Sequence, residues 1–148
     1  MTVDELETAK AYLCQLKTLN DLINDMQEDS EKILAQITKI TPTLQLVAVS
    51  GGGSKDTLGD GIVKLVALQK EIDAEVNKCV ELKKEIRAVI SSVKNDKYRT
   101  VLRKRYVLFK TWEQIACEMG CTYQWVNILD KRARRVVAKI ISQKNLNS

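Results

Sequence analysis

The chain has 148 residues, of which 45% are hydrophobic and 5% aromatic, and it contains a single proline. This composition favours long helices and argues against a β-rich sandwich. The net charge of +5 hides an asymmetry, because residues 1–93 carry eleven Lys/Arg against fifteen Asp/Glu (−4) and residues 94–148 carry thirteen against four (+9). The basic segment indicates a polyanionic partner for that part of the chain, and a basic face that is merely solvated is the alternative.

Residues 3–41 are predicted to form one long amphipathic helix, because apolar side chains recur at steps of three and four. Pro42 follows, and it predicts that the helix stops near Ile40 and Thr41. The apolar positions form two neighbouring stripes, and so wide a face requires more than one neighbouring helix. The stripes contain Leu6, Leu13, Leu16, Ile23, Leu34 and Ile37, and beside them Leu19, Leu22, Met26, Ile33 and Ile40.

The periodic pattern is lost over residues 43–57, which are predicted to form a flexible loop. The run from Leu44 to Val49 is short enough for either a small strand or an extended arm. The segment from Ser50 to Ser54, with three glycines between, has the composition of a linker. A phosphate-binding loop is the alternative, although the segment lacks the spacing and the Lys-Ser/Thr ending of a P-loop.

A second long helix is predicted for residues 57–93, again from steps of three and four. Two helices of this length cannot hide their apolar faces alone, so we expect an antiparallel, coiled-coil-like hairpin over residues 1–93 that also pairs with a second subunit. A hairpin that serves only as a scaffold is the alternative. The periodic positions are Ile62, Leu65, Ile72, Val76, Cys79, Ile86, Ile90 and Val93.

The helical spacing of apolar residues ends at residues 94–96, where a second domain covering residues 94–148 is predicted to begin. Asn95 or Asp96 can cap a helix over residues 96–108. Thr111 can cap the next, short helix, with Gln114 completing a capping box. Gly120 falls at the chain reversal, where a left-handed backbone is needed.

Thr122 is predicted to cap a further helix that completes a helix-turn-helix. Its inward positions are Val126, Leu129 and Ala133, and its outward face enters the major groove if the motif docks as others do. Gln124 and Asn127 can pair with adenine edges, and Ile128 can touch a thymine methyl. Basic side chains at the far end and on the preceding helix are predicted to reach phosphates. The predicted DNA-contacting residues are Thr122, Tyr123, Gln124, Asn127, Ile128, Lys131, Arg132, Arg135, Arg103, Lys104 and Lys110.

Two features of this segment have a plainer interpretation. The spacing of the apolar residues and the glycine in this motif also fits two helices that pack together without binding DNA. Packing alone, however, gives no reason for nine net positive charges. Trp112 is predicted to cover the packed helices, with base stacking as the alternative.

The chain contains four cysteines and no histidine. Only Cys117 and Cys121 are close in sequence, so we expect neither a metal site nor another cofactor. Without histidine, a paired-carboxylate motif or an activated cysteine, the chain is not expected to be an enzyme. No apolar run approaches ~18 residues and no signal peptide is visible, which predicts a cytoplasmic protein without a membrane partner.

Part of the basic segment resembles the promoter-reading fourth region of bacterial sigma factors. The resemblance lies in Arg105-Tyr106, in the run from Lys110 to Ala116, in Met119-Gly120 and in Val126. Nearly the whole chain resembles the ArpU-like or RinA-like transcription regulators of phages and prophages of Gram-positive bacteria. In the first half, this similarity lies in Tyr12-Leu13, in Ser50 to Asp56 and in Leu68 to Glu85. The chain departs from these relatives at Asn127, Asp130 and Arg134, so the DNA sequence that it reads is expected to differ from theirs.

The resemblance implies an all-α protein in which a helical hairpin precedes a sigma-region-four-like helix-turn-helix. It also implies a sequence-specific DNA-binding regulator, acting as a homo-oligomer in the bacterial host cell, that activates late phage or prophage genes. In sigma factors this region also contacts RNA polymerase. The alternative is therefore a protein-interaction module that binds RNA polymerase or another phage protein without reading DNA.

Overall fold

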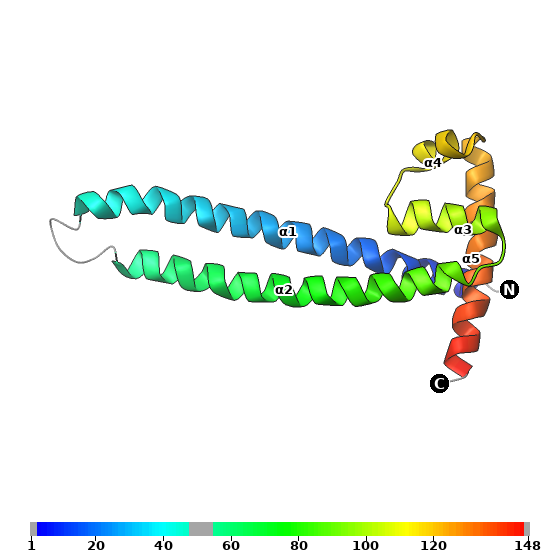
Figure 1. Ribbon diagram of the computed structural model, residues 1–148, viewed down its shortest axis with the longest axis horizontal. Helices are drawn as coiled ribbons and strands as arrows, with labels where there is room; N and C mark the ends of the chain where they lie inside the picture. Colours follow the sequence, from blue (N-terminus) through cyan, green and yellow to red (C-terminus); the bar gives the residue numbers. More distant parts are fainter. Residues whose placement is uncertain (1–2, 48–54, 147–148) are drawn as a thin grey trace. The chain divides into compact units, whose positions relative to one another are not determined.

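The computed structural model of the protein describes the backbone of residues 3–47 and 55–146, and the side chains of residues 3–39 and 58–146 (Figure 1). Every regular element in these ranges is helical, and the predicted all-α class is confirmed. The elements are α1 (Val3–Val47), α2 (Lys55–Ser91), α3 (Asp96–Leu102), the π-helical turn η1 (Arg103–Val107), α4 (Trp112–Met119) and α5 (Tyr123–Leu146). Among the described residues, no helix combines the length and apolar character that a membrane span requires.

The first helix is longer than the sequence predicts. It passes through Pro42 and ends at Val47, so the predicted stop is wrong, and so is a strand or extended arm over residues 44–47. A proline removes one backbone donor, and the helical hydrogen bonds on either side of it can persist. The proposed linker from Ser50 to Ser54 lies outside the described residues.

The chain folds into two compact units. One contains residues up to Leu19 together with those from Cys79 onward, and the other contains residues between Asn20 and Lys78. This division differs from the boundary predicted between residues 93 and 94. The helical spacing of apolar residues ends at this predicted boundary because a helix ends there. The buried cluster that holds the unit together contains residues from both sides of the boundary.

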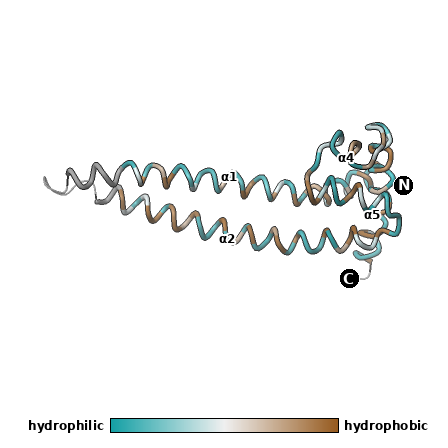
Figure 2. Tube along the Cα trace, turned by 45° about the horizontal axis from the view of Figure 1, so that its top comes forward, coloured by the Kyte–Doolittle hydropathy of each residue, from teal (hydrophilic) through white to brown (hydrophobic). Residues whose placement is uncertain are grey.

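The unit between Asn20 and Lys78 consists of segments of α1 and α2 that lie side by side and run in opposite directions (Figure 1). A Cβ atom on Gly61 would lie 3.1 Å from Cγ1 of Ile37, so the missing side chain permits a close approach of the helices. Figure 2 shows hydrophobic and hydrophilic positions alternating along both segments. Only Ile23 and Ile72 are buried among this unit's described apolar side chains, so its core is thin.

The other unit has a larger core that joins distant parts of the chain. Within it, the first turns of α1 and the last turns of α2 pack against η1 and the middle of α5. The hydroxyl of Tyr12 donates a hydrogen bond of 3.2 Å to Glu85, and burial together with this carboxylate raises the pKa of Tyr12 to about 12. The buried cluster contains Ala9, Leu13, Leu16, Ile86, Val89, Ile90, Val93, Leu102, Tyr106, Val107, Ala133, Val137 and Ala138.

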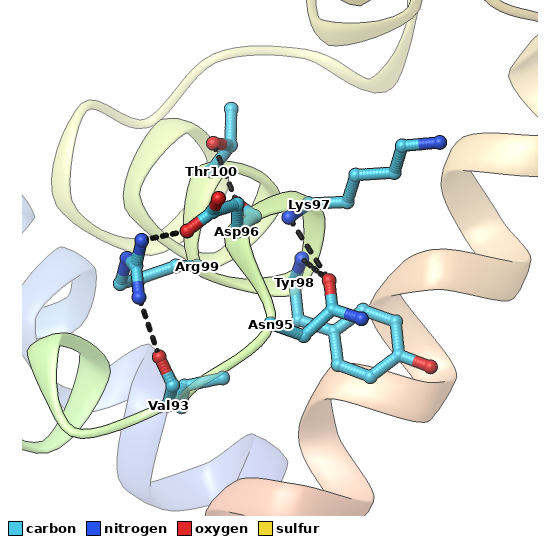
Figure 3. A network of polar contacts seen from close by, with 7 residues as sticks. All are labelled: Val93, Asn95, Asp96, Lys97, Tyr98, Arg99 and Thr100. Carbon is cyan, nitrogen blue, oxygen red and sulfur yellow. Dashed lines mark hydrogen bonds and ion pairs between the residues drawn. The ribbon is translucent and has the colours of Figure 1, made fainter.

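A polar network fixes the junction between α2 and α3 (Figure 3). The Asn95 side chain accepts hydrogen bonds from the backbone N–H groups of Lys97 and Tyr98 at 3.0 and 3.2 Å, which confirms the predicted cap. Arg99 donates to the carbonyl of Val93 at 2.8 Å and forms an ion pair with Asp96. The start of α3 is therefore tied to the chain that precedes it.

Candidate nucleic-acid interface

The turn between α4 and α5 has the local structure that the sequence predicts. The Thr111 hydroxyl accepts from the Gln114 N–H at 3.2 Å, and the Gln114 side chain accepts from the Thr111 N–H at 2.9 Å. Gly120 ends α4 with φ 64°, in the left-handed region. The hydroxyl of Thr122 accepts from the N–H of Trp125 at 3.1 Å and caps α5. These four residues act as predicted.

A small apolar cluster holds α4 against α5. Ile115, Ala116 and Val126 are buried in it, and Trp112 packs against it from outside. The guanidinium of Arg105 lies 4.3 Å from the centroid of the Trp112 ring. Trp112 therefore covers the packed helices, in agreement with the first interpretation of this residue.

From Val126 to Ala138, one side of α5 is buried, with Leu129, Asp130, Ala133 and Val137 between them. On the opposite side, Gln124, Ile128, Lys131 and Arg135 follow one another at steps of four, three and four, so they form a stripe along the helix. All four are exposed, and Ile128 remains 43% accessible. We call these four residues the outward stripe of α5. It consists entirely of residues predicted to contact DNA.

Asn127 lies off this stripe. Its side chain is half-buried, and its amide donates a hydrogen bond of 3.0 Å to the carbonyl of Tyr123. A bidentate contact to adenine uses the amide donor and the carbonyl acceptor, and one of the two N–H bonds of the Asn127 amide is already engaged. Gln124 has no such bond among the described residues and is the better candidate for this contact.

The remaining predicted residues of α5 lie at its exposed ends and flanks. Tyr123 is 45% accessible at the first turn. The guanidinium of Arg132 lies 5.4 Å from the centroid of the Trp125 ring, and this stacking holds the cation on the surface beside the outward stripe. The side chains of Tyr123 and Arg132 are both exposed, so each can reach a ligand that lies along the outward stripe.

The predicted basic residues before α4 do not behave alike. Arg103 in η1 is exposed and forms no ion pair within the described residues. Lys104 and Lys110, in contrast, both bind the same oxygen of Glu118, at 3.0 and 2.5 Å. Hydrogen bonds from the two lysines, Lys110 first, lower the pKa of the Glu118 carboxyl. Both lysines were predicted to contact DNA, and their pairing with Glu118, one of four acidic residues after residue 93, was not predicted.

A short turn holds these two lysines near each other. The backbone N–H of Lys110 donates to the carbonyl of Lys104 at 3.0 Å. The Arg105 side chain donates to the carbonyl of Lys110 at 2.9 Å. Between them, Phe109 has φ 57°, a left-handed backbone that a bulky residue rarely adopts, and its ring packs against the core. The position of Lys110 is therefore set by the backbone as well as by its ion pair.

Asp130 is the one buried charged residue among the described side chains, with 3% of its surface accessible. One carboxylate oxygen accepts from the hydroxyl of Tyr106 at 2.8 Å, and the other accepts from Nε of Arg134 at 3.0 Å. Burial raises the pKa of Asp130, although the two hydrogen bonds act in the opposite direction. In the sequence, Asp130 and Arg134 stand out only as departures from a family pattern, and this network was not predicted.

Most Lys and Arg side chains after residue 93 form no ion pair among the described residues. Arg99, Lys104, Lys110 and Arg134 form ion pairs, and the other nine Lys/Arg of this segment form none within the described residues. Lys131 and Arg135 of the outward stripe belong to these nine. The stripe therefore lies in a positive field that ion pairs do not cancel.

A groove of about 640 Å³ lies elsewhere on the same unit, between the residues that follow α2 and the second half of α5. Val93, Tyr98 and Ile140 contribute to its apolar floor, and Lys139 and Lys144 line it as well. None of the residues predicted to contact DNA lines this groove.

Comparison with known proteins gives a family and no function. No curated protein and no solved structure gives a significant match to this chain. One family pattern matches residues 40–137, about two thirds of the sequence, and this range includes α4 and the outward stripe of α5. The chain belongs to that family, which is described as a protein of unknown function (DUF1492).

Proposed function

We propose that this protein binds duplex DNA with sequence preference and regulates transcription in a phage or prophage programme, as an activator of late genes. The observation that supports this most directly is the outward stripe of α5. Its side chains combine an amide, an apolar group and two cations on the face opposite the core, and these are the groups that read base edges and hold phosphates.

Electrostatics supports the same proposal. The segment after residue 93 has a net charge of +9 by sequence, and nine of its cations form no ion pair with any residue that the structure describes. Neutralising DNA phosphates releases counterions, so such a surface gains affinity for any duplex at low salt. Base contacts from Gln124 and Ile128 would then add preference for one sequence.

We also propose that a second copy of the chain covers the thin unit between Asn20 and Lys78. An amphipathic hairpin of two helices leaves apolar surface that a further pair of helices can bury. Two copies would bring two outward stripes to one DNA molecule and multiply weak single-site binding. The exposed apolar residues of this unit are Leu22, Leu34, Ile62, Val63, Val66 and Val76.

The test is the salt dependence of duplex binding. Fluorescence anisotropy with a labelled random-sequence duplex, from about 50 to 200 mM salt, should give a negative slope of log K against log salt. Arg135→Ala should weaken binding and reduce the slope by about 0.9, the value for one phosphate contact. Lys70→Ala is the matched control, because Lys70 is an exposed cation on α2, and it should leave the slope unchanged.

Two results would overturn the proposal. The first is a folded protein that ignores duplexes even at the lowest salt concentration. The second is an equal loss of binding from Arg135→Ala and Lys70→Ala, since this would mean that net charge alone matters. If DNA binding is observed, selection of bound fragments from phage and host genomes should identify the preferred sequence.

A further inference from the structure

Two lysines that were predicted to bind DNA phosphates already hold an anion supplied by the chain itself. Lys104 comes from η1, Lys110 from the turn after it, and Glu118 from the last turn of α4. Both ammonium groups contact the same oxygen, Oε1, of Glu118, at 3.0 and 2.5 Å. The three side chains thus form a small anion site in which the anion is a carboxylate.

The geometry of this site suits a phosphate equally well. Carboxylate and phosphate oxygens accept the same charge-assisted hydrogen bonds from ammonium groups. The backbones of the two lysines are held together independently of Glu118, because a hydrogen bond of 3.0 Å joins the Lys110 N–H to the Lys104 carbonyl. Solvent and ligands can reach the site, since 22% of the Lys104 side chain, 31% of the Lys110 side chain and 35% of the Glu118 side chain is accessible.

We propose that Glu118 occupies the place of a DNA phosphate, so that a duplex binds fully only after its phosphate displaces this carboxylate from Lys104 and Lys110. This inference rests on the proposed DNA-binding function and adds a mechanism that limits it. The carboxylate carries no information about base sequence. Its presence therefore weakens binding to every duplex by the same factor and leaves the preference set by the outward stripe unchanged.

A purely structural role for the pair predicts something different. These ion pairs remain partly accessible, so solvent screens them and limits their contribution to stability. The capping box, the left-handed Gly120 and the apolar cluster around Ile115 already hold α4 in place. Removing the charge of Glu118 should thus change DNA affinity much more than it changes folding.

The experiment compares two glutamates of the same helix. Glu118→Gln frees both lysines, whereas Glu113→Gln removes an equal charge from an exposed α4 residue that forms no ion pair among the described residues. With the random-sequence duplex, Glu118→Gln should bind about five- to tenfold more tightly at about 50 mM salt and steepen the salt slope by about 0.9 to 1.8, for one or two gained phosphate contacts. Glu113→Gln should change affinity less than about twofold, as a distant charge does under screening.

A third variant tests whether the increase in DNA affinity comes from the two lysines. In the Glu118→Gln background, replacing Lys104 and Lys110 by alanine should abolish the increase in affinity and return the slope to the value of the unsubstituted protein or below it. Glu118→Asp retains the charge on a side chain one methylene shorter. It should show an intermediate gain, and it keeps the test usable if the glutamine variant folds poorly by circular dichroism.

Each result has a defined meaning. Equal effects of Glu118→Gln and Glu113→Gln, or weaker binding by Glu118→Gln and Glu118→Asp, would overturn the displacement proposal while leaving DNA binding intact. Failure of the unsubstituted protein and of all variants to bind duplexes in dilute salt would overturn the proposed function, and the displacement with it.

Discussion

The phenolic oxygen of Tyr106 lies 2.8 Å from a carboxylate oxygen of Asp130, and this hydrogen bond joins η1 to the buried side of α5. Arg134 completes the network from one helical turn further along α5. Because Asp130 points inward, the opposite side of the helix, which carries the outward stripe, points to solvent. The network therefore helps to set the rotation of α5 about its own axis.

The first prediction removes this hydrogen bond. Tyr106→Phe leaves a buried carboxylate with one partner fewer, which should lower the free energy of unfolding by about 1–3 kcal/mol. Tyr98→Phe is the control, because the Tyr98 side chain is also partly buried and its hydroxyl forms no hydrogen bond among the described residues. Urea denaturation followed by circular dichroism measures both. A similar loss of unfolding free energy in the two variants would show that the Tyr106–Asp130 hydrogen bond does not contribute to stability beyond what any tyrosine hydroxyl does.

The second prediction concerns the pH dependence of stability. Burial raises the pKa of Asp130 above its ordinary value of 3.8, so the folded protein holds this proton more tightly than the unfolded chain does. The contribution of Asp130 to stability is therefore fully present below about pH 3.8 and is lost as the pH rises through the raised pKa. Asp130→Asn removes this titration.

The measurement is the difference in unfolding free energy between the unsubstituted protein and Asp130→Asn, followed from about pH 4 upward. Relative to Asp130→Asn, the unsubstituted protein should become less stable as the pH rises. A constant difference, or one of opposite sign, contradicts the raised pKa.

The third prediction concerns the turn before α5. A Cβ atom on Gly120 would meet nothing within 4 Å, so the cost of Gly120→Ala comes from the left-handed backbone alone and should be about 1–2 kcal/mol. Gly120→Asn should cost less, because asparagine tolerates this conformation better than alanine. Thermal or urea unfolding of the two variants gives the comparison, and an equal cost for both would point to a changed backbone.

The fourth prediction separates the two amides that were both expected to read adenine. Gln124→Ala should reduce the preference for the selected DNA sequence over a mismatched one by about 1–3 kcal/mol. Asn127→Ala should reduce it less, because its amide already donates to the carbonyl of Tyr123. Dissociation constants for the selected and mismatched duplexes test this, and the reverse ranking would move the base contact to Asn127.

Local features of the fold could be predicted from the sequence because their causes are local. The caps at Asn95, Thr111 and Thr122 and the left-handed Gly120 each depend on a few neighbouring residues. The same holds for the outward stripe, since helical spacing alone separates Gln124 and Arg135 from the buried side of α5.

What the sequence did not reveal depends on residues far apart in the chain. The Tyr106–Asp130 pair spans 24 positions, and the lysines that bind Glu118 are 14 and 8 positions away from it. Periodicity carries no information about such partners. The same limit explains the predicted boundary at residue 93, because the burial of Val93 beside Ala133 and Leu13 becomes visible only once the chain is folded.

The unit that carries α5 is assembled from two separated stretches, one ending at Leu19 and the other starting at Cys79. The residues between Asn20 and Lys78 are therefore inserted between the two stretches of this unit. Because the buried cluster contains no residue of this insertion, shortening both of its helical segments by matched whole turns should leave that cluster intact. A fragment starting at residue 94, in contrast, would lack the α1 and α2 side chains that line the same cluster, and would not be a portable domain.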